Sequence, residues 1–508
     1  MVRRLAAVAF AFTALGFAQP QPVSFDILIR NGRVMDGSGN PWIRTDIGIT
    51  GDRIAAMGRL EGAAAGRIVD AHDLVVAPGF IDVHSHAGEG LGNPALREAQ
   101  PIVAQGVTTV AINPDGGGPV NLAEQRAMFE RGGIGLNVAP LIGHGSVRAA
   151  VMGQANRAPT PAELDRMTAL VTQALRDGAF GLSSGLFYVP GSFAKTEEVI
   201  ALARAVAPFG GVYTSHIRDE ADYGIGVEAA VKEVIRIAEE AGVRGIVTHM
   251  KALGRDNWGK SASLLKDIDD ARSRGVEVFA DQYPYEASST SLRAALAPNG
   301  IQPTEPAVTD NLRRRGGPAS IMIAFCRRDP SIDGKTLADI AAARQVSPVQ
   351  AAIDIINGGD ASIVSFNMSE ADIEAIMRAP YTMASSDGAL VPVGAGHPHP
   401  RDYGAFARRL AVYVRERKVV SLEFAIRSMT SLPAAVFGIR DRGVVRPGAF
   451  ADVAIFDPAT IADEATYTDP QRLATGVPTV IVNGVIVRDG GKFTGALPGR
   501  VLRRDGSR

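Results

Sequence analysis

The stretch GFIDVHSHAGEG, residues 79–90, places two histidines one position apart at the end of an apolar run. Side chains alternate between the two faces of a β-strand, so His84 and His86 would share one face. Two imidazoles on one face can bind one metal ion, although for an isolated pair a surface strand end that happens to carry histidines is the favoured interpretation. The chain has only eight histidines, so the positions of the others decide between the two interpretations.

Eight strand-like runs, of which VVAPGFIDVHSH is the first, alternate with amphipathic stretches through the middle of the chain. The other runs are GVTTVAINPD, NVAPLIGHG, AFGLSSGL, VYTSHIRDE, RGIVTHMKALG, EVFADQYPY and YTMASSDG. Intervening stretches such as TPAELDRMTALVTQALRDG repeat apolar residues at i, i+3 and i+4, which is typical of helices. Eight βα units predict an α/β fold, a (β/α)8 TIM-like barrel, with its active site at the C-terminal ends of the strands.

The two terminal segments have a different pattern, with short strands and glycine turns. Residues 23–76 and 436–498 share it, so we expect them to pair into one small β-sandwich beside a catalytic barrel of residues 77–435. Extra helices between the seventh and eighth runs predict an insertion around residues 290–350, over the barrel mouth.

The balance of charges in the composition bears on the kind of partner. Among 508 residues, 53 Lys and Arg nearly cancel 54 Asp and Glu, which argues against a nucleic-acid partner and indicates a small molecule.

Residues 1–18 have a basic start, an apolar run and small residues at the end, like a secretory signal peptide. The apolar run falls short of the roughly 20 residues that span a bilayer, so we expect an exported protein, periplasmic or secreted, without a membrane span. The oligomeric state is not indicated.

Residues that commonly bind metals gather at the ends of the predicted strands. They are His84 and His86 after the first strand, Asp115 after the second, His144 after the third, His216 after the fifth, His249 after the sixth and Asp387 after the eighth. Because the C-terminal ends of barrel strands meet at one rim, these side chains should converge there. Histidine with carboxylate is the ordinary ligand set of catalytic zinc, so the pattern predicts a site for one or two Zn²⁺ ions.

Three of the polar side chains at this rim are candidates for binding substrate. Lys251 lies two residues beyond His249 on the same strand face, where it would bind an anion, such as a free carboxylate of the substrate, or form a structural ion pair. Arg218 repeats this spacing after His216, but it could equally pair with one of the two acids that follow it. His144 could polarise a carbonyl or could be structural.

Several motifs resemble the metal-dependent amidohydrolase superfamily: GFIDVHSH, TSHIRDE, VTHMK, SSDG and RPGAFADVAIFDP. Longer segments, among them DQYPYEASST, HPRDYGAFAR and MTSLPAAVFGI, are similar to the N-acyl-D-amino-acid deacylase (D-aminoacylase) family along almost the whole mature chain. The resemblance implies a barrel flanked by a β-sandwich built from both termini. It also implies zinc-dependent hydrolysis of N-acyl-D-amino acids to a carboxylate and a free D-amino acid.

The resemblance further implies which residues bind metal. In the family, two histidines, here His216 and His249, hold one zinc tightly together with a cysteine, while His84 and His86 match two ligands of a second, weaker position. This chain departs from the family pattern because NPDGGG places Asp115 at the cysteine position. Asp115 could still bind zinc, could bridge two ions, or could be a turn residue that caps backbone groups.

The same resemblance assigns catalytic and substrate-binding roles. Asp387 would be the third ligand of the weaker position and the general base that moves a proton from the attacking water to the departing amine; an Asx turn or helix cap in SSDG is the alternative. Lys251, Tyr283 and Ser289 would hold the α-carboxylate of the substrate, and Tyr283 could instead be a core aromatic.

Other functions remain open. A metal-dependent dipeptidase acting on D-configured or mixed-chirality dipeptides needs the same carboxylate site and only a roomier acyl pocket. A non-catalytic exported binding protein would bind N-acyl amino acids without hydrolysing them. A cyclic-amide hydrolase is less favoured, because such enzymes usually carry a carboxylated lysine after the fourth strand, and GLSSGLFYVP has no lysine.

Overall fold

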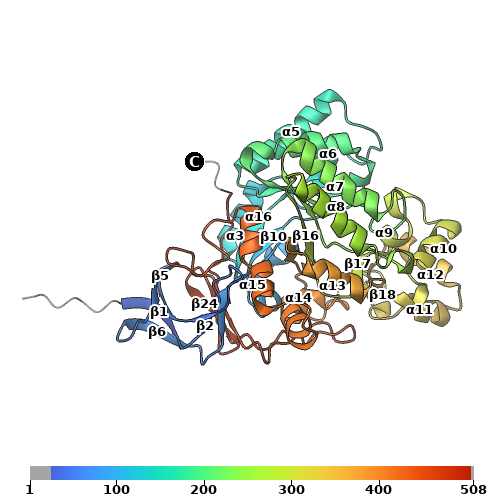
Figure 1. Ribbon diagram of the computed structural model, residues 1–508. Helices are drawn as coiled ribbons and strands as arrows, with labels where there is room; N and C mark the ends of the chain where they lie inside the picture. Colours follow the sequence, from blue (N-terminus) through green and yellow to red (C-terminus); the bar gives the residue numbers. More distant parts are fainter. Residues whose placement is uncertain (1–23, 505–508) are drawn as a thin grey trace, which may run out of the picture.

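The computed structural model describes residues 24–504 as a mixed α/β fold in which strands and helices alternate through the middle of the chain (Figure 1). The predicted signal peptide, residues 1–18, lies outside the described residues. Within them, the eight predicted runs form the strands β8 (Phe80–Asp82), β10 (Val107–Ile112), β11 (Asn137–Pro140) with β12 (Ile142–Gly143), β13 (Gly181–Gly185), β14 (Val212–His216), β15 (Arg244–Val247), β16 (Val278–Gln282) and β20 (Thr382–Ala384).

Parallel ladders join these strands mostly in chain order. One sheet has the order β11-β10-β8 and another has the order β12-β13-β14-β15-β16-β20. Just beyond the first and last strands, β9 (Ser85–His86) pairs in parallel with β21 (Gly388–Ala389). In addition, the backbone N–H of Asp387 donates to the carbonyl of His84 at 2.9 Å. The C-terminal ends of the first and eighth strands therefore lie side by side.

Helices follow most of these strands, and one of them shows both an amphipathic face and a capped start. In α5 (Pro161–Arg176) the Thr160 hydroxyl accepts from the N–H of Glu163, whose carboxylate accepts from the N–H of Thr160, and Met167 and Val171 are buried. The other helices that follow the strands are α3 (Leu122–Gly132), α4 (His144–Met152), α6 (Thr196–Arg204), α7 (Val227–Ala241), α8 (Ser261–Ser273), α13 (Glu370–Arg378), α14 (Arg401–Arg408), α15 (Leu422–Met429) and α16 (Ser431–Phe437).

Both terminal segments contribute to β-sheets at one end of the molecule (Figure 1). Their strands are β1 (Ser24–Arg30), β2 (Arg33–Val34), β3 (Ile43–Arg44), β4 (Asp46–Thr50), β5 (Arg53–Gly58), β6 (Ala64–Asp70), β7 (Val75–Pro78), β22 (Val453–Phe456), β23 (Thr479–Val482), β24 (Val485–Asp489) and β25 (Lys492–Phe493). A seven-stranded sheet, order β25-β24-β23-β22-β7-β2-β3, combines strands from both ends of the chain. A four-stranded sheet, order β5-β4-β1-β6, shares a hydrophobic core with it that includes Ile27, Ile49, Val76 and Val453.

The segment between the seventh and eighth strands forms a unit of its own, at the opposite end of the molecule from the terminal sheets (Figure 1). It contains β17 (Ala287–Ser291), α9 (Leu292–Leu296), α10 (Glu305–Arg314), β18 (Ile321–Phe325), α11 (Leu337–Arg344), α12 (Pro348–Asn357) and β19 (Ser362–Phe366), packed around a separate core. The unit is longer at both ends than the predicted 290–350, because its first and last strands pair, with Ala287 opposite Phe366.

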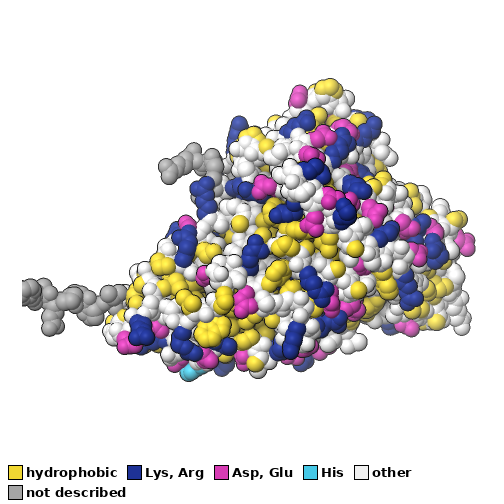
Figure 2. Space-filling model, in the orientation of Figure 1, with side chains coloured by type: hydrophobic (Ala, Val, Ile, Leu, Met, Phe, Trp, Pro, Cys, Tyr) yellow, Lys and Arg dark blue, Asp and Glu magenta, His cyan; other side chains and the backbone are white. Residues whose placement is uncertain are grey.

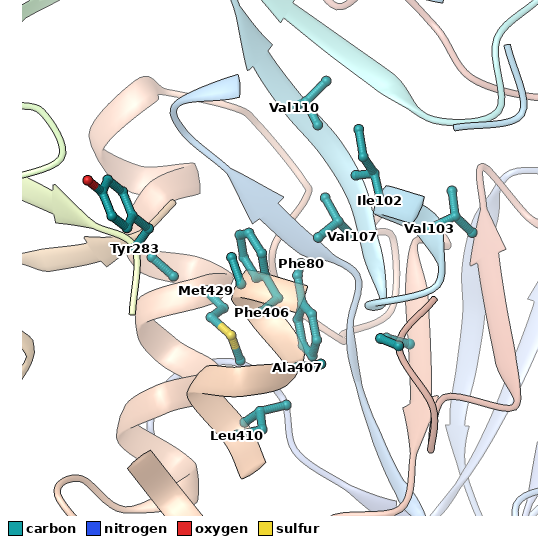
Figure 3. Close-up of a cluster of buried hydrophobic side chains, with 14 of the residues drawn as sticks. Phe80, Ile102, Val103, Val107, Val110, Tyr283, Phe406, Ala407, Leu410 and Met429 are labelled. Atoms are coloured by element: carbon teal, nitrogen blue, oxygen red, sulfur yellow. The ribbon is translucent and has the colours of Figure 1, made fainter. Parts of the chain in front are cut away.

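One large buried cluster joins the first strand to the helices that follow the eighth (Figure 3). The ring of Phe80 stacks on that of Phe406 in α14, with centroids 6.1 Å apart. Tyr283 lies at the margin of this cluster, with its hydroxyl turned away from the two stacked rings (Figure 3). The packing holds α14, which begins at Arg401, against the strand that leads to His84.

The face of the molecule in Figure 2 carries charged side chains of both signs together with hydrophobic side chains. On the face shown in Figure 2, Lys and Arg side chains are interspersed with Asp and Glu side chains. None of the helices in the described part of the chain is long and apolar enough to cross a membrane.

Candidate metal centre and substrate cavity

The ligands predicted after the first, second and eighth strands converge. Nε2 of His84 lies 3.3 Å from Oδ1 of Asp115 and 3.5 Å from Oδ1 of Asp387. Nε2 of His86 lies 3.4 Å from Oδ2 of Asp115 and 3.2 Å from Oδ1 of Asp387. One ligand atom from each of the four residues lies within 4.8 Å of the others, which is close enough for one cation to contact all of them.

Asp115 also belongs to a second group, with the histidines after the fifth and sixth strands. Its Oδ2 lies 3.9 Å from Nδ1 of His216, and its Oδ1 lies 3.6 Å from Nε2 of His249. Ligand atoms of these three residues again lie within 4.8 Å of one another. Asp115 therefore stands between the two groups, where a carboxylate could bridge two cations.

Several buried polar atoms of these groups have no hydrogen-bond partner among residues 24–504. They are both ring nitrogens of His84 and of His216, Nε2 of His249 and Oδ1 of Asp115. Leaving a buried polar atom unsatisfied costs about 1–3 kcal/mol. Imidazole nitrogens facing carboxylate oxygens are the donor set of zinc and related divalent ions. A bound cation would satisfy one nitrogen of each ring and Oδ1 of Asp115, so the residues fit a metal centre.

Left-handed backbone conformations orient three of these side chains. The angle φ is 54° at Asp115, 35° at His249 and 50° at Asp387. A non-glycine residue in this region costs on the order of 1–3 kcal/mol and persists where the surrounding structure holds it, often at functional sites. In each case the turn follows shortly after a strand ends, at the residue that joins the cluster.

Burial and neighbouring charges oppose each other in this centre. Burial raises the pKa of Asp387, but Arg401, whose Nη1 lies 2.7 Å from Oδ2, and the nearby histidines outweigh burial and hold that pKa well below its usual value. Burial likewise raises the pKa of Asp115, but the nearby histidines, chiefly His84, outweigh burial and keep that pKa well below its usual value. Burial lowers the pKa of His86, yet Asp115 and Asp387 raise it to about 10. Both carboxylates are thus ionised at neutral pH and able to bind a cation or accept a proton.

The centre lies on the wall of a cavity of about 1610 Å³. This volume exceeds the roughly 300–1,000 Å³ of ordinary small-molecule sites. The insertion and the loop after β21 form much of the remaining wall, through Ser288, Ser289, Thr290, Arg315, Phe325, Arg327, Val391, Pro392 and Pro398. Ser289, predicted from the sequence as a substrate residue, is therefore placed at the cavity.

Lys251 also lines the cavity, but its amino group already has protein partners. Nζ lies 2.6 Å from Oε1 of Glu220 and donates to the carbonyl of His249 at 2.8 Å. Tyr283 is buried between Lys251 and Arg401: Nζ of the lysine lies 5.5 Å from its ring centroid, and Cζ of the arginine lies 4.8 Å from it. Tyr283, expected from the sequence to hold the substrate carboxylate, is not among the described residues that line the cavity, and its hydroxyl donates to Sδ of Met368 at 3.6 Å.

Two other expected substrate residues lie away from the cavity. Nε and Nη2 of Arg218 donate to the carboxylate of Glu233 at 2.9 and 2.8 Å, rather than to the acids next to Arg218 in sequence. His144 is fully buried, with Nε2 3.0 Å from Oε1 of Glu198, which also pairs with Arg148. Within the described chain, neither Arg218 nor His144 is among the residues lining the cavity.

Three residues at the site were not expected from the sequence. Arg401 pairs with Asp387, Glu220 contacts both His249 and Lys251, and the ring of Tyr188 lies 4.6 Å from that of His216. All three line the cavity. The sequence contains all three, in HPRDYGAFAR, TSHIRDE and GLSSGLFYVP, but each lies several residues beyond the end of a strand, where the period of the strand no longer sets the direction of a side chain.

Comparison with known proteins matches the chain over most of its length. A family model described as "Amidohydrolase family" matches residues 67–488. The D-aminoacylase of Alcaligenes xylosoxydans xylosoxydans is 37% identical over 512 residues, which cover 96% of this chain and 99% of that protein.

Two solved structures are similar over the same extent. The crystal structure of N-acyl-D-glutamate deacylase from Bordetella bronchiseptica, complexed with zinc and a phosphonate that mimics the tetrahedral intermediate, has a TM-score of 0.84 and 37% identity; the match covers 94% of this chain and 100% of that one. A structure of D-aminoacylase, solved to study its binuclear metal center, has a TM-score of 0.84 and 35% identity, with the same coverage of 94% and 100%.

Proposed function

The chain belongs to the amidohydrolase family and is an amide-bond hydrolase, and from this premise we propose that it hydrolyses N-acyl-D-amino acids to a carboxylate and a free D-amino acid. The observation that carries the proposal is the convergence of imidazoles and carboxylates from five strand ends on one cavity wall. The relatives over the full length include a D-aminoacylase and an N-acyl-D-glutamate deacylase, which supports this substrate class.

The proposed cofactor is zinc, in a centre of two ions that share Asp115. The first ion would be held by His216, His249 and Asp115, and the second by His84, His86, Asp387 and Asp115. Support comes from the position of Asp115, whose two oxygens lie 3.3–3.9 Å from ring nitrogens of all four histidines. When bound, zinc supplies Lewis acidity, which polarises the amide carbonyl and lowers the pKa of water toward about 7.

Asp387 is the proposed general base and acid. Its carboxylate accepts a proton from the attacking water and then donates that proton to the nitrogen of the departing amine. This role requires an ionised carboxylate at the start of the reaction, which the adjacent guanidinium of Arg401 favours. The alternative interpretation of Asp387 as a local turn residue does not account for its contacts with His84, His86 and Arg401.

The α-carboxylate of the substrate is proposed to bind between Lys251, Ser289 and Arg401, which all line the cavity. Lys251 and Arg401 flank Tyr283, so two cations face one part of the wall. Since each cation already has a carboxylate neighbour, Glu220 or Asp387, the substrate anion would share these cations with the protein.

A second candidate function, cleavage of dipeptides with a D-configured C-terminal residue, is favoured by the size of the cavity, about 1610 Å³. A panel of N-acetyl-D- and N-acetyl-L-amino acids with D- and L-dipeptides, assayed with zinc removed and restored, separates the candidates. Zinc-dependent release of D-amino acids from the N-acetyl compounds is expected. Faster cleavage of the dipeptides would favour the second function, and binding without turnover would favour a non-catalytic binding protein.

Two further proposals concern the fold and the location of the protein. We infer that the eight strands form a closed barrel flanked by a sandwich of both terminal segments, supported by the β9–β21 pairing and by the seven-stranded sheet. We also infer export to the periplasm or the medium, directed by residues 1–18. N-terminal sequencing of the exported protein should find a start after Ala18.

A further inference from the structure

One carboxylate contacts both histidines of the first proposed metal position. Oε1 of Glu220 lies 3.0 Å from Nδ1 of His249, and Oε2 lies 3.8 Å from Nε2 of His216. The other nitrogen of each ring faces Asp115, at 3.6 Å for His249 and 3.9 Å for His216. Each imidazole therefore has the metal-facing carboxylate on one side and Glu220 on the other.

Lys251 competes for the same side of His249. Its Nζ lies 2.7 Å from Nδ1 of His249 and 2.6 Å from Oε1 of Glu220. A lysine ammonium can only donate, so a bond from Lys251 to Nδ1 would put the imidazole proton on Nε2, the nitrogen that faces Asp115. If Glu220 instead accepts a hydrogen bond from a proton on Nδ1, the result is the opposite: the lone pair of Nε2 stays free to bind a metal.

The position of Glu220 is itself well fixed. Glu220 is only 7% exposed, Lys251 4% and His249 1%, so these contacts are formed with little water. The carbonyl of Glu220 accepts from the N–H of Leu253 at 2.7 Å, which ties the segment after the fifth strand to the segment after the sixth. The neighbouring Asp219 accepts from three backbone N–H groups of the loop that follows Glu220, those of Ala221, Gly224 and Gly226.

We propose that Glu220 is a positioning residue: it accepts the proton on Nδ1 of His249, which leaves Nε2 of that ring free for a metal, and it holds the ammonium of Lys251 beside it. The proposal rests on the proposed metal-dependent function and adds a residue that contacts neither the reacting atoms nor the metal. Metal affinity and the position of the substrate-binding lysine would then depend on one side chain.

The decisive experiment measures zinc affinity of the metal-free full-length protein by competition with a chelator. Glu220→Ala should bind zinc about 10–100-fold more weakly, the usual effect of losing a carboxylate behind a metal-binding histidine. The double variant Glu220→Ala/Lys251→Met should recover part of that affinity, because the competing donor is gone. A merely structural role for Glu220 predicts no recovery. Glu124→Gln, which removes a carboxylate from the same cavity wall, should stay within about twofold of the wild type.

The imidazole tautomer gives a second readout that does not depend on activity. In metal-free protein labelled with nitrogen-15, at a pH where the ring is neutral, His249 should carry its proton on Nδ1 in the wild type and on Nε2 in Glu220→Ala. If Glu220→Ala does not fold, Glu220→Gln serves instead, because its amide oxygen can still accept from one ring, and its zinc affinity should fall between the two.

Two outcomes would overturn the proposal: a folded Glu220→Ala protein that binds zinc as tightly as the wild type, or a double variant as weak as Glu220→Ala. Failure of the proposed function is distinguishable from either. It would show in the wild type itself, as an absence of zinc binding or of zinc-dependent hydrolysis of N-acetyl-D-amino acids.

Discussion

Nη1 of Arg401 lies 2.7 Å from Oδ2 of Asp387, and both side chains are buried in the wall of the cavity. Arg401 is the first residue of α14, and the stacking of Phe406 on Phe80 holds this helix against the first strand. Packing against the strand that carries the HxH motif therefore holds Arg401 in place beside Asp387. The charge of Arg401 can then set the pKa of the proposed general base.

Replacing Arg401 by methionine should raise the pKa of Asp387. Burial raises this pKa, and the charge of Arg401 is the strongest effect that lowers it. Asp387 must be ionised to accept a proton, so the acid limb of the pH profile of kcat/KM should move to higher pH. Arg401→Lys keeps the charge and should shift the limb less. An acid limb that stays in place in Arg401→Met would show that Arg401 does not control Asp387.

Asp387→Asn should lower kcat by about 10²–10⁴, the usual contribution of a general base, while the protein keeps zinc at the position of His216 and His249. The amide cannot accept the proton of the attacking water, but it occupies the same space beside His84 and His86. Steady-state kinetics together with zinc analysis of the same preparation test both statements. A variant that retains near wild-type kcat would remove Asp387 from the mechanism.

Asp115→Ala should lower the zinc content at both positions, because its two oxygens face all four histidines. Elemental analysis after dialysis against a weak chelator measures this. Asp115→Cys is the matched variant, since a thiolate is also a zinc ligand and stands here in the family to which the motifs are similar; it should keep zinc bound by His216 and His249. Unchanged zinc content in Asp115→Ala would mean that Asp115 is only a turn residue.

Lys251→Met should raise KM for an N-acetyl-D-amino acid far more than for the corresponding amide, because only the acid carries the carboxylate that Lys251 is proposed to bind. Arg218→Met is the control: it also removes a cation two positions after a strand-end histidine, but this one pairs with Glu233 outside the cavity. Its KM values should change little for either substrate. Equal effects of Lys251→Met on both substrates would refute the assignment.

The sequence predicts that these strand-end residues converge because they follow a rule of the backbone: strands of period two end at a common rim, so residues at strand ends meet. His84, Asp115 and Asp387 are predicted in this way although hundreds of residues separate the first from the last. The partner of Arg218 could not be predicted, because Glu233 lies on α7, and the rotation of a helix about its axis depends on packing.

Arg401 and Glu220 were missed for a related reason. Arg401 reaches Asp387 from the start of α14, a helix whose position depends on the stacking of Phe406 on Phe80. Glu220 lies beyond the end of the fifth strand in a loop shaped by Asp219, and loop conformation does not follow from the period of the strand. The extent of the insertion was underestimated because the pairing of Ala287 with Phe366 joins residues far apart in sequence.

The buried group formed by His144, Arg148 and Glu198 yields a prediction about stability rather than catalysis. Glu198 pairs with His144 and Arg148, which are fully buried. Glu198→Gln leaves the charge of Arg148 buried without its partner, and breaking such a pair costs about 3–5 kcal/mol. We expect a markedly lower midpoint of thermal unfolding at neutral pH, with KM of the remaining folded enzyme unchanged because the group lies outside the cavity lining.

The pH dependence of that loss has a definite sign. Burial raises the pKa of Glu198, but its bonds to His144 and Arg148 outweigh burial and hold the pKa below the ordinary value of 4.5. A carboxylate whose pKa is depressed by folding stabilises the protein above its unfolded pKa, and this stability is lost as the pH falls through the lower, folded pKa. The difference in unfolding midpoint between wild type and Glu198→Gln should therefore shrink as the pH falls below about 4.5. Thermal unfolding followed by circular dichroism above and below this pH measures it, and a difference that grows on acidification would show that the Glu198 carboxylate is not stabilised by its buried partners.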